Sequence, residues 1–242
     1  MNNEKRYGRF TSSNIYKLMS NPTLKAKTEG VIFGKPALTY IEEKNMENRL
    51  GRSLSTETGG REVTWGKLVE RRVFDLLGTQ YSLSSTLTDV HPTIPFWAGS
   101  KDGLKHEDEI TVFDIKCPFT LKSFCNFADC TTIDEVREKH DSGENYFWQL
   151  VSNAILTGAK WAELICYVPY RDELSEIREM ASYYEGDQNK VAWVEWATDD
   201  DIPYLIKGGH YKNLNVLRFE VKQSDKDALT ERVKLAGEML NK

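Results

Sequence analysis

Two charged side chains, Asp114 and Lys116, lie two residues apart in the stretch FDIKCPF, residues 113–119. The stretch alternates as a β-strand does, and residues two apart on a strand point to the same face. The carboxylate and the ammonium group are therefore expected to emerge together, with Phe113 and Ile115 on the opposite face. A solvated ion pair on an edge strand is the simplest interpretation, because Asp-x-Lys occurs by chance in many proteins.

A second carboxylate, Asp102, lies in SKDGL, at the end of one predicted strand. The segments 96–105 and 110–117 read as two strands joined by the acidic turn HEDE, residues 106–109, and a hairpin between them would bring Asp102 close to Asp114. Clustered carboxylates with oxygen-only neighbours suit Mg²⁺ or Mn²⁺ rather than zinc. A lysine beside them can orient or help to deprotonate a metal-bound water, or stabilise charge at a scissile phosphate.

The composition is that of an ordinary globular protein. The chain has 242 residues, of which 40% are hydrophobic and 29% charged, which suits one domain. No apolar run approaches the roughly 20 residues of a membrane span. The polar N-terminus lacks a signal-peptide core, so we expect a cytoplasmic protein that makes no contact with membranes.

The four cysteines indicate a reducing compartment. Cys117, Cys125, Cys130 and Cys166 form no CxxC pair, which argues against a disulfide framework. Three of them with His140 also match no zinc or iron–sulfur motif.

The charge is unevenly distributed along the chain. The net charge is −5, but residues 1–72 hold fourteen Lys and Arg against eight Asp and Glu, and the remaining residues are acidic. A basic first third on an acidic body could form a surface that faces a polyanion. A chance imbalance on solvated helices is an equally good interpretation of the charge alone.

The periodicity predicts an α/β fold with a central mixed β-sheet flanked by helices. We expect a short helix after residue 11, capped by Ser12 or Ser13, and a closing helix capped by Ser224. Thr64 is the expected cap of a helix that Gly78 ends. Further helices are predicted at 36–50, 121–127, 133–139 and 145–156, further strands at 162–168, 191–198 and 215–221, and a loop at 53–63.

Five blocks of the sequence resemble, in order, the lambda-type exonucleases, or YqaJ-like viral recombinase nucleases, of the PD-(D/E)xK superfamily. The blocks are RYGRFTSS, WGKLVE, GSKDGL, DIKCPFT and YFWQLVSNAILTGAKWAELICYVPY, which span residues 6 to 170. Each block alone is a weak or moderate signal, whereas their joint order is specific. Residues 171–242 carry no usable motif.

The resemblance implies a role for each matching residue. Asp102, Asp114, Glu70 and the backbone carbonyl of Ile115 would hold Mg²⁺, with Mn²⁺ as an alternative. Lys116 would be the catalytic lysine, and Gln149 would hydrogen-bond the nucleophilic water or the phosphate. Tyr146 lies one turn earlier on the same face and is a further catalytic candidate, with a core aromatic residue as an equally good interpretation. The residues that match positions cradling a 5′-phosphate are Arg6, Ser13 and Ser100, with Arg9 as a nearby competitor to Arg6.

Two departures from the family's pattern are visible. Asp114 replaces a glutamate that is common there, and the acid that some relatives carry before the serine–x–aspartate turn has only Asp89 or His91 as a counterpart. The resemblance therefore leaves the ligands of a second metal ion unassigned. For Glu70, the competing interpretation is an exposed helix glutamate near Arg71 or Arg72.

The implied function is 5′-to-3′ degradation of duplex DNA, which leaves 3′ single-stranded tails for recombination by strand annealing. The implied partners are DNA ends, two further copies in a ring-shaped trimer and a single-strand annealing protein, in a phage or prophage protein acting in its bacterial host. We expect one nuclease domain, with an end-binding segment at 1–62, a catalytic core at 63–170 and a C-terminal part at 171–242. An endonuclease with the same core and a catalytically silent DNA-end-binding protein are the alternatives.

Overall fold

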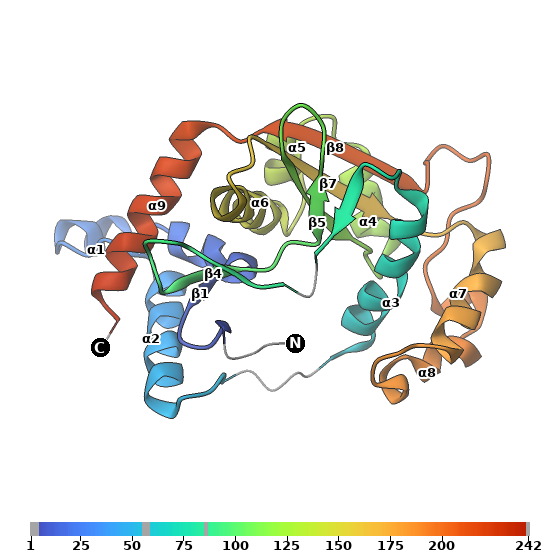
Figure 1. The fold of residues 1–242 in the computed structure, drawn as a ribbon, viewed down its shortest axis with the longest axis horizontal. Coiled ribbons are helices and arrows are strands. Elements are labelled where there is room, and N and C mark those ends of the chain that lie inside the picture. The colour runs from blue at the N-terminus through green and yellow to red at the C-terminus, as the bar shows by residue number, and fades with distance from the viewer. Residues whose placement is uncertain (1–4, 55–58, 85–86, 241–242) are drawn as a thin grey trace.

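The computed structural model describes residues 5–54, 59–84 and 87–240. It contains two β-sheets with helices on both sides (Figure 1), which confirms the predicted α/β class. The larger sheet has the strand order β2-β5-β6-β7-β8, and the smaller has the order β1-β4-β3. The large sheet is mixed, because β6 and β7 run parallel while the other neighbours run antiparallel. Its strands are β2 (Tyr81–Leu83), β5 (Gly103–Lys105), β6 (Thr111–Lys116), β7 (Trp161–Tyr167) and β8 (Leu214–Glu220).

The small sheet ties the N-terminus to the middle of the chain. Its strands are β1 (Phe10–Thr11), β3 (Asp89–Val90) and β4 (Trp97–Gly99). β1 runs parallel to β4, with Phe10 opposite Trp97 and Thr11 opposite Ala98. The two strands therefore end side by side.

Helices make up most of the remaining described chain. The α-helices are α1 (Leu24–Thr28), α2 (Lys35–Leu50), α3 (Arg61–Leu76), α4 (Leu121–Ala128), α5 (Ile133–Lys139), α6 (Gly143–Thr157), α7 (Leu174–Ser182), α8 (Gln188–Trp196) and α9 (Gln223–Glu238). Three 3₁₀ segments join them: η2 (Ser12–Met19), η3 (Arg171–Glu173) and η4 (Asp199–Asp201). No helix in the described ranges is both long and apolar enough to cross a membrane.

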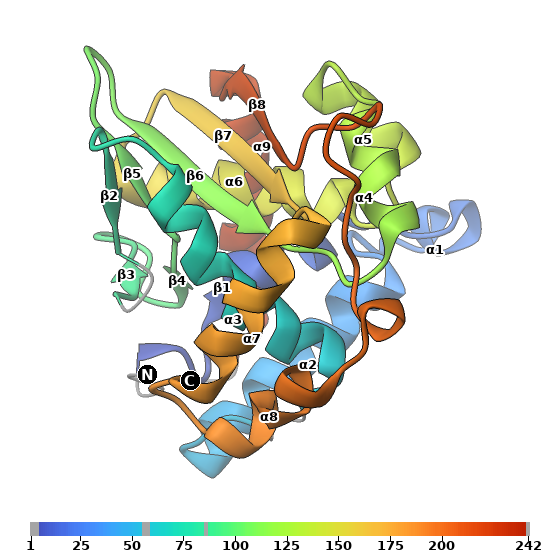
Figure 2. The same ribbon diagram turned by 90° about the vertical axis from the view of Figure 1, so that its right-hand side faces the viewer.

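Two hydrophobic cores lie on the two faces of the large sheet. Val112 of β6 and Leu164 of β7 pack in the core that contains α6 and α9. Phe113 and Ile115 of β6 point the other way, into a core with α3, α7 and α8. Figure 2 shows α3, α7 and α8 gathered on one side of the sheet, with α6 and α9 behind it. Alternation along β6 therefore turns its even-numbered residues toward α6.

Most predicted elements are confirmed. The expected hairpin forms, since β5 pairs antiparallel with β6. The helices expected at 36–50, 121–127, 133–139 and 145–156 are α2, α4, α5 and α6 within a few residues. The strands expected at 162–168 and 215–221 are β7 and β8. Gly51 ends α2 in the left-handed conformation, with φ of 66°, as a glycine after a helix commonly does.

Residues 191–198 were predicted as a strand, and this is wrong, because they belong largely to helix α8. Val191 and Val194, three residues apart, are both buried in the core beside α3. The indole N–H of Trp193 also donates to Thr64 Oγ1 at 3.3 Å. Tertiary packing at a spacing of three residues overrides the strand preference of the valines and tryptophans.

The predicted strand 96–105 is also wrong, because it divides between two sheets. β4 belongs to the small sheet and β5 to the large one, with Ser100 to Asp102 as the connection. A single alternating pattern cannot reveal this break, because both halves are extended and pair with different neighbours.

The predicted helix caps are displaced. The helix expected from Thr64 begins at Arg61, inside the predicted loop 53–63, and residues 55–58 of that loop lie outside the described residues. Thr64 Oγ1 donates back to the carbonyl of Arg61 at 3.1 Å instead of capping. The N-caps of η2 and α9 are Thr11 and Lys222, rather than Ser12 or Ser13 and Ser224. Helix α3 ends at Leu76, with Leu77 as its C-cap rather than Gly78.

Candidate active site

Asp114 and Lys116 lie on the face of β6 that points toward α6. Asp114 is 2% exposed, and the Nζ atom of Lys116 lies 2.5 Å from Asp114 Oδ2. The strand is central, between β5 and β7, rather than at a sheet edge. The interpretation as a solvated edge-strand ion pair is therefore wrong for Asp114, because a carboxylate buried at this depth needs compensating partners.

Asp102 lies next to Asp114 because the hairpin register continues beyond β5. Gly103 is opposite Phe113, so the residue before it falls opposite Asp114. Asp102 Oδ2 accepts a hydrogen bond from the backbone N–H of Ile115 at 2.6 Å. This contact fixes the Ser100–Asp102 connection against the end of β6.

Helix α6 supplies two side chains to the same place. Gln149 Nε2 donates to Asp114 Oδ1 at 2.6 Å, and the Lys116 ammonium group donates to Gln149 Oε1 at 3.3 Å. The ammonium group also lies 5.0 Å from the centre of the Tyr146 ring, one helical turn earlier. Residues three apart on a helix share a face, so α6 holds Gln149 and Tyr146 together over Lys116.

Glu70 reaches the cluster from α3. Burial, followed by the negative charge of Asp114, raises the pKa of Glu70 from 4.5 to about 7, although Lys116 and Lys67 oppose this rise. Arg71 instead pairs with Glu185, and Arg72 pairs with Glu173 and Glu176. Glu70 is therefore half-buried and within range of the charges of Asp114 and Lys116, whereas its neighbouring arginines pair with other glutamates.

Burial has the largest effect on the carboxyl groups here, and repulsion between their negative charges adds to it. Burial raises the pKa of Asp102 well above its ordinary value, and Asp114 and Glu70 raise it further. Burial alone would lower the pKa of Lys116, but the charges of Asp114 and Asp102 and the contact with Asp114 outweigh burial and raise it. The adjacent carboxylates of Asp102 and Asp114, with the charge of Glu70 acting on them, thus favour additional positive charge beside Lys116.

The donor set fits a divalent cation of the Mg²⁺ class. The available ligands are carboxylate oxygens, which hard cations prefer. Asp114 Oδ2 receives no hydrogen bond of good geometry despite its burial and its closeness to Lys116. Among the described residues, no three His, Cys, Asp or Glu side chains converge as a complete metal-binding cluster. Asp102 and Asp114 each give one oxygen to a protein hydrogen bond, which leaves the other oxygen of each as a potential ligand.

Two of the three residues expected to hold a phosphate lie near the ends of the parallel strands β1 and β4. Ser13 follows β1 in η2, and Ser100 directly follows β4, two residues before Asp102. The two segments pack tightly there, because a Cβ atom on Gly99 would lie 2.1 Å from the Ser12 side-chain oxygen Oγ. Ser100 Oγ lies 3.1 Å from Thr88 Oγ1, and Ser13 Oγ lies 3.5 Å from Thr11 Oγ1.

The two candidate arginines precede β1 rather than follow it. Arg6 is half-buried, and within the described chain no hydrogen bond or ion pair joins it to Ser13, Ser100 or the carboxylates. Arg9 donates from Nε to the carbonyl of Pro95 at 2.7 Å, which ties it to the approach to β4. The structure therefore brings Asp114, Lys116 and Gln149 into contact, with Asp102 beside them, whereas no contact among the described residues joins Arg6 to Ser13 or Ser100.

One lysine near the site, Lys101, was not singled out from the sequence. Lys101 is buried and its ammonium group lies 2.5 Å from Asp89 Oδ2, so it holds the connection between the sheets. Asp89 is one of the two residues compared above with the additional acid of some relatives, and it is held in this ion pair with Lys101. The other, His91, stacks on Trp97. The sequence shows that Lys101 lies between the candidate residues Ser100 and Asp102. It does not show that the Lys101 side chain points toward Asp89.

All four cysteines are free, and Cys117 and Cys166 are buried. Burial raises the pKa of both thiols. His140 Nε2 lies 2.9 Å from Ser123 Oγ.

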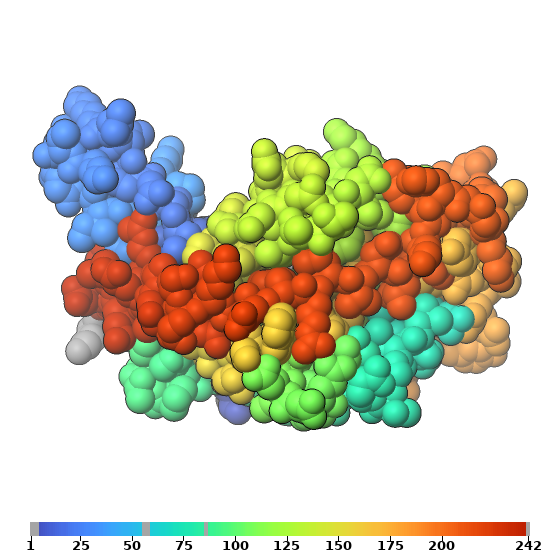
Figure 3. Space-filling model, turned by 90° about the horizontal axis from the view of Figure 1, so that it is seen from above, coloured from blue at the N-terminus to red at the C-terminus, as the bar shows by residue number. Residues whose placement is uncertain are grey.

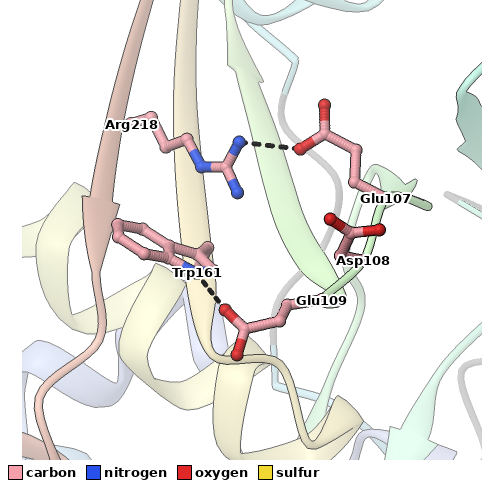
Figure 4. Close-up of a pocket in the computed structure, with 5 residues that line it drawn as sticks. All are labelled: Glu107, Asp108, Glu109, Trp161 and Arg218. Atoms are coloured by element: carbon pink, nitrogen blue, oxygen red, sulfur yellow. Dashed lines mark hydrogen bonds and ion pairs between the residues drawn. The ribbon is translucent and has the colours of Figure 1, made fainter.

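A separate hollow of about 760 Å³ lies at the start of β6, away from the carboxylate cluster (Figure 4). Its acidic wall is the 106–109 turn, where Glu107 accepts from Arg218 at 2.7 Å and Glu109 accepts from the Trp161 indole at 2.7 Å. Lys160 also pairs with Glu109. Because Glu107, Glu109, Lys160 and Arg218 pair with one another, these charges hold the turn against β7 and β8, and we assign no second reactive site to the hollow.

No protein-family model matches the sequence, and no curated protein matches it. Solved structures do match. A phage-related exonuclease from Haemophilus somnus 129PT superposes with a TM-score of 0.63 at 17% identity, covering 96% of this chain and 93% of that one. LHK-Exo, an alkaline exonuclease from Laribacter hongkongensis, superposes with a TM-score of 0.57 at 17% identity, covering 97% and 89%.

LHK-Exo in complex with dAMP gives a TM-score of 0.59 at the same identity, covering 98% and 90%. In these three structures the likeness thus covers 96–98% of this chain, and so includes most of residues 171–242, for which the sequence offered no motif. The chain has the fold of the alkaline and phage-related exonucleases, as its resemblance to the lambda-type family implied.

Proposed function

We propose that this protein is a metal-dependent exonuclease that degrades duplex DNA from a 5′ end and leaves a 3′ single-stranded tail. The observation that carries the proposal is the convergence of Asp102, Asp114, Lys116 and Gln149 at the end of one strand, with Glu70 close by. The shared fold with known exonucleases supports the same reaction class. Fold alone does not define activity, so the argument depends on the site.

Asp102, Asp114, Glu70 and the carbonyl of Ile115 are the groups that would hold Mg²⁺, or alternatively Mn²⁺. The cation would supply Lewis-acid stabilisation of the phosphodiester and a nucleophilic water at neutral pH. The protein's contribution is a set of buried carboxylates whose repulsion is relieved when a cation binds.

Neighbouring carboxylates raise the pKa of Lys116, which favours its ammonium form in the metal-free protein. In that form Lys116 would stabilise negative charge that develops on the phosphate. Gln149 bonds to both Asp114 and Lys116 through the two ends of its amide, which fixes their relative orientation. The Tyr146 ring lies against the Lys116 ammonium group and limits its movement.

Ser13, Ser100 and Arg6 are proposed to recognise the 5′-phosphate of the DNA end. Hydroxyl groups and a guanidinium group are suited to phosphate oxygens. The serines support this role by lying near the ends of β1 and β4, with Ser100 only two residues from Asp102. Arg9 is the alternative cation, since it lies immediately before β1.

The resemblance also supports a place in recombination. We propose a ring of three subunits around the duplex, a single-strand annealing protein as partner, Mg²⁺ as the metal, and a phage or prophage origin with action in the bacterial cytoplasm. A ring would reconcile the acidic net charge with DNA binding, because only its channel needs to be basic.

Degradation of matched linear and circular duplexes in Mg²⁺ tests the reaction class. We expect mononucleotides from the linear duplex, with a label at a 5′ end released before a label at a 3′ end. Nicking or linearisation of the covalently closed circle would identify an endonuclease instead, and no cleavage of any substrate would leave only a DNA-binding function.

A further inference from the structure

Three large apolar side chains are far more exposed than the others in the described chain. Leu24 is 86% exposed, Trp196 is 83% exposed and Tyr183 is 77% exposed. Leu24 belongs to α1, whereas the two aromatic residues belong to the hairpin of α7 and α8. Figure 1 places α1 and the α7–α8 hairpin at opposite ends of the longest axis of the molecule. Figure 3 shows the blue N-terminal segment that contains α1 projecting from the rest of the protein.

The α1 end carries a groove with aliphatic and cationic walls. The groove has a volume of about 640 Å³ and is lined by Leu24, Val31, Ile32, Lys27 and Arg232, among others. Ile32 is 52% exposed. The Arg232 guanidinium donates to the carbonyl of Ile32 at 2.9 Å and to Asn21 Oδ1 at 2.8 Å. These hydrogen bonds hold Arg232 in place in the wall of the groove.

The α1 end is also basic. Residues 21–35 contain three lysines and one glutamate. Among the described residues, neither Lys25 nor Lys27 forms an ion pair, so both ammonium groups are available to an external carboxylate.

The opposite end is acidic and carries a protruding indole. Trp196 is the last residue of α8, and Glu195 and the run Asp199–Asp201 flank it in the sequence. Residues 174–201 contain eight Asp and Glu against two Lys and Arg. Asp199 is engaged with Arg171 and Arg178, but Glu195 and Asp200 form no ion pair among the described residues.

We propose that Trp196 of one copy docks into the α1 groove of a second copy, so that the chains associate head to tail. The indole would cover the apolar surface of Leu24 and Ile32, with Lys27 and Arg232 near its ring. The surrounding acids of one copy would face Lys25 and Lys27 of the other. Tryptophan is the side chain most enriched among residues that dominate binding energy, and cations favour its face.

The two surfaces differ from each other and lie at opposite ends of the molecule, so the contact is heterologous. Such a contact builds a closed ring when the rotation between neighbours permits closure. The proposal therefore supplies specific surfaces for the assembly proposed above. It is independent of nuclease activity, because it rests only on exposure and charge.

Sedimentation of mixed variants tests the geometry directly. Trp196→Ser removes the indole, and Leu24→Asp places a charge in the groove. Each change should raise the dissociation constant at least about thirtyfold, which corresponds to a hot-spot residue, and leave each variant monomeric. A mixture should form a one-to-one dimer that does not grow further, because each variant retains the surface that the other lacks.

Tyr183→Ser is the matched control, since it removes an equally exposed aromatic ring from the same hairpin without touching Trp196 or its acids. It should assemble as the wild type does. Association of the wild type should also weaken as salt rises. The proposal is overturned by a wild type that stays monomeric at high micromolar concentration. Assembly of either single variant like the wild type, or failure of the mixture to form a dimer, would also overturn it. Circular dichroism confirms that each variant is folded.

Discussion

Replacing Glu70 with glutamine should stabilise the metal-free protein at neutral and alkaline pH. The pKa of Glu70 rises from 4.5 to about 7 on folding, chiefly through burial and then through Asp114. Between these values the folded protein keeps a proton that the unfolded chain releases, so the free energy of unfolding falls as pH rises through this window. Each pKa unit is worth about 1.4 kcal/mol, so ionising Glu70 costs the folded state on the order of 3 kcal/mol.

Urea unfolding in EDTA, followed near pH 4.5 and near pH 8, measures this cost. At the lower pH the Glu70→Gln variant and the wild type should have similar free energies of unfolding. At the higher pH the variant should be more stable by about 2–3 kcal/mol, because its amide carries no charge to be buried. Glu62→Gln, on the exposed first turn of the same helix, should change stability by no more than about 0.5 kcal/mol. A variant no more stable than the wild type near pH 8 would refute the placement of Glu70 in the carboxylate cluster.

Three further predictions concern the metal, the lysine and the DNA end. Mg²⁺ at a hundred times its dissociation constant should stabilise the wild type by about 2.7 kcal/mol, and calorimetric scans should show this gain abolished in Asp114→Asn. Lys116→Ala should keep the Mg²⁺-induced stabilisation but lose several orders of magnitude in turnover; normal turnover would exclude Lys116 from catalysis. Arg6→Ala should cost about one to two decades in rate on 5′-phosphorylated ends only, since a hydrogen bond to a charged group is worth roughly 1.5–3 kcal/mol. An equal loss on phosphorylated and hydroxyl ends would transfer the role to Arg9.

The reactive strand could be predicted from the sequence because its information is local. Alternation puts Asp114 and Lys116 on one face of β6, and the acidic turn before it makes a hairpin that delivers Asp102. The spacing of Tyr146 and Gln149 likewise follows from the helical period of α6. Predicting these features requires only the periodicities of a strand and of a helix, together with the turn at residues 106–109.

The remaining features depend on contacts between distant segments. The raised pKa of Glu70 requires α3 to pack beside β6, and the helical state of residues 191–198 requires a core against α3 and α7. The division of 96–105 between two sheets depends on β1, which lies more than eighty residues earlier. No local pattern encodes these contacts, because they arise from tertiary packing.

The central claim is that the carboxylate and lysine cluster at the end of β6 hydrolyses DNA with the help of a divalent cation. Its most direct test is nucleotide release from a linear duplex in Mg²⁺ by the wild type and by Asp114→Asn, with both proteins shown to be folded. We predict rapid release by the wild type, none in EDTA, and a loss of several orders of magnitude in the variant. Release by Asp114→Asn at the wild-type rate would contradict the assignment of the site.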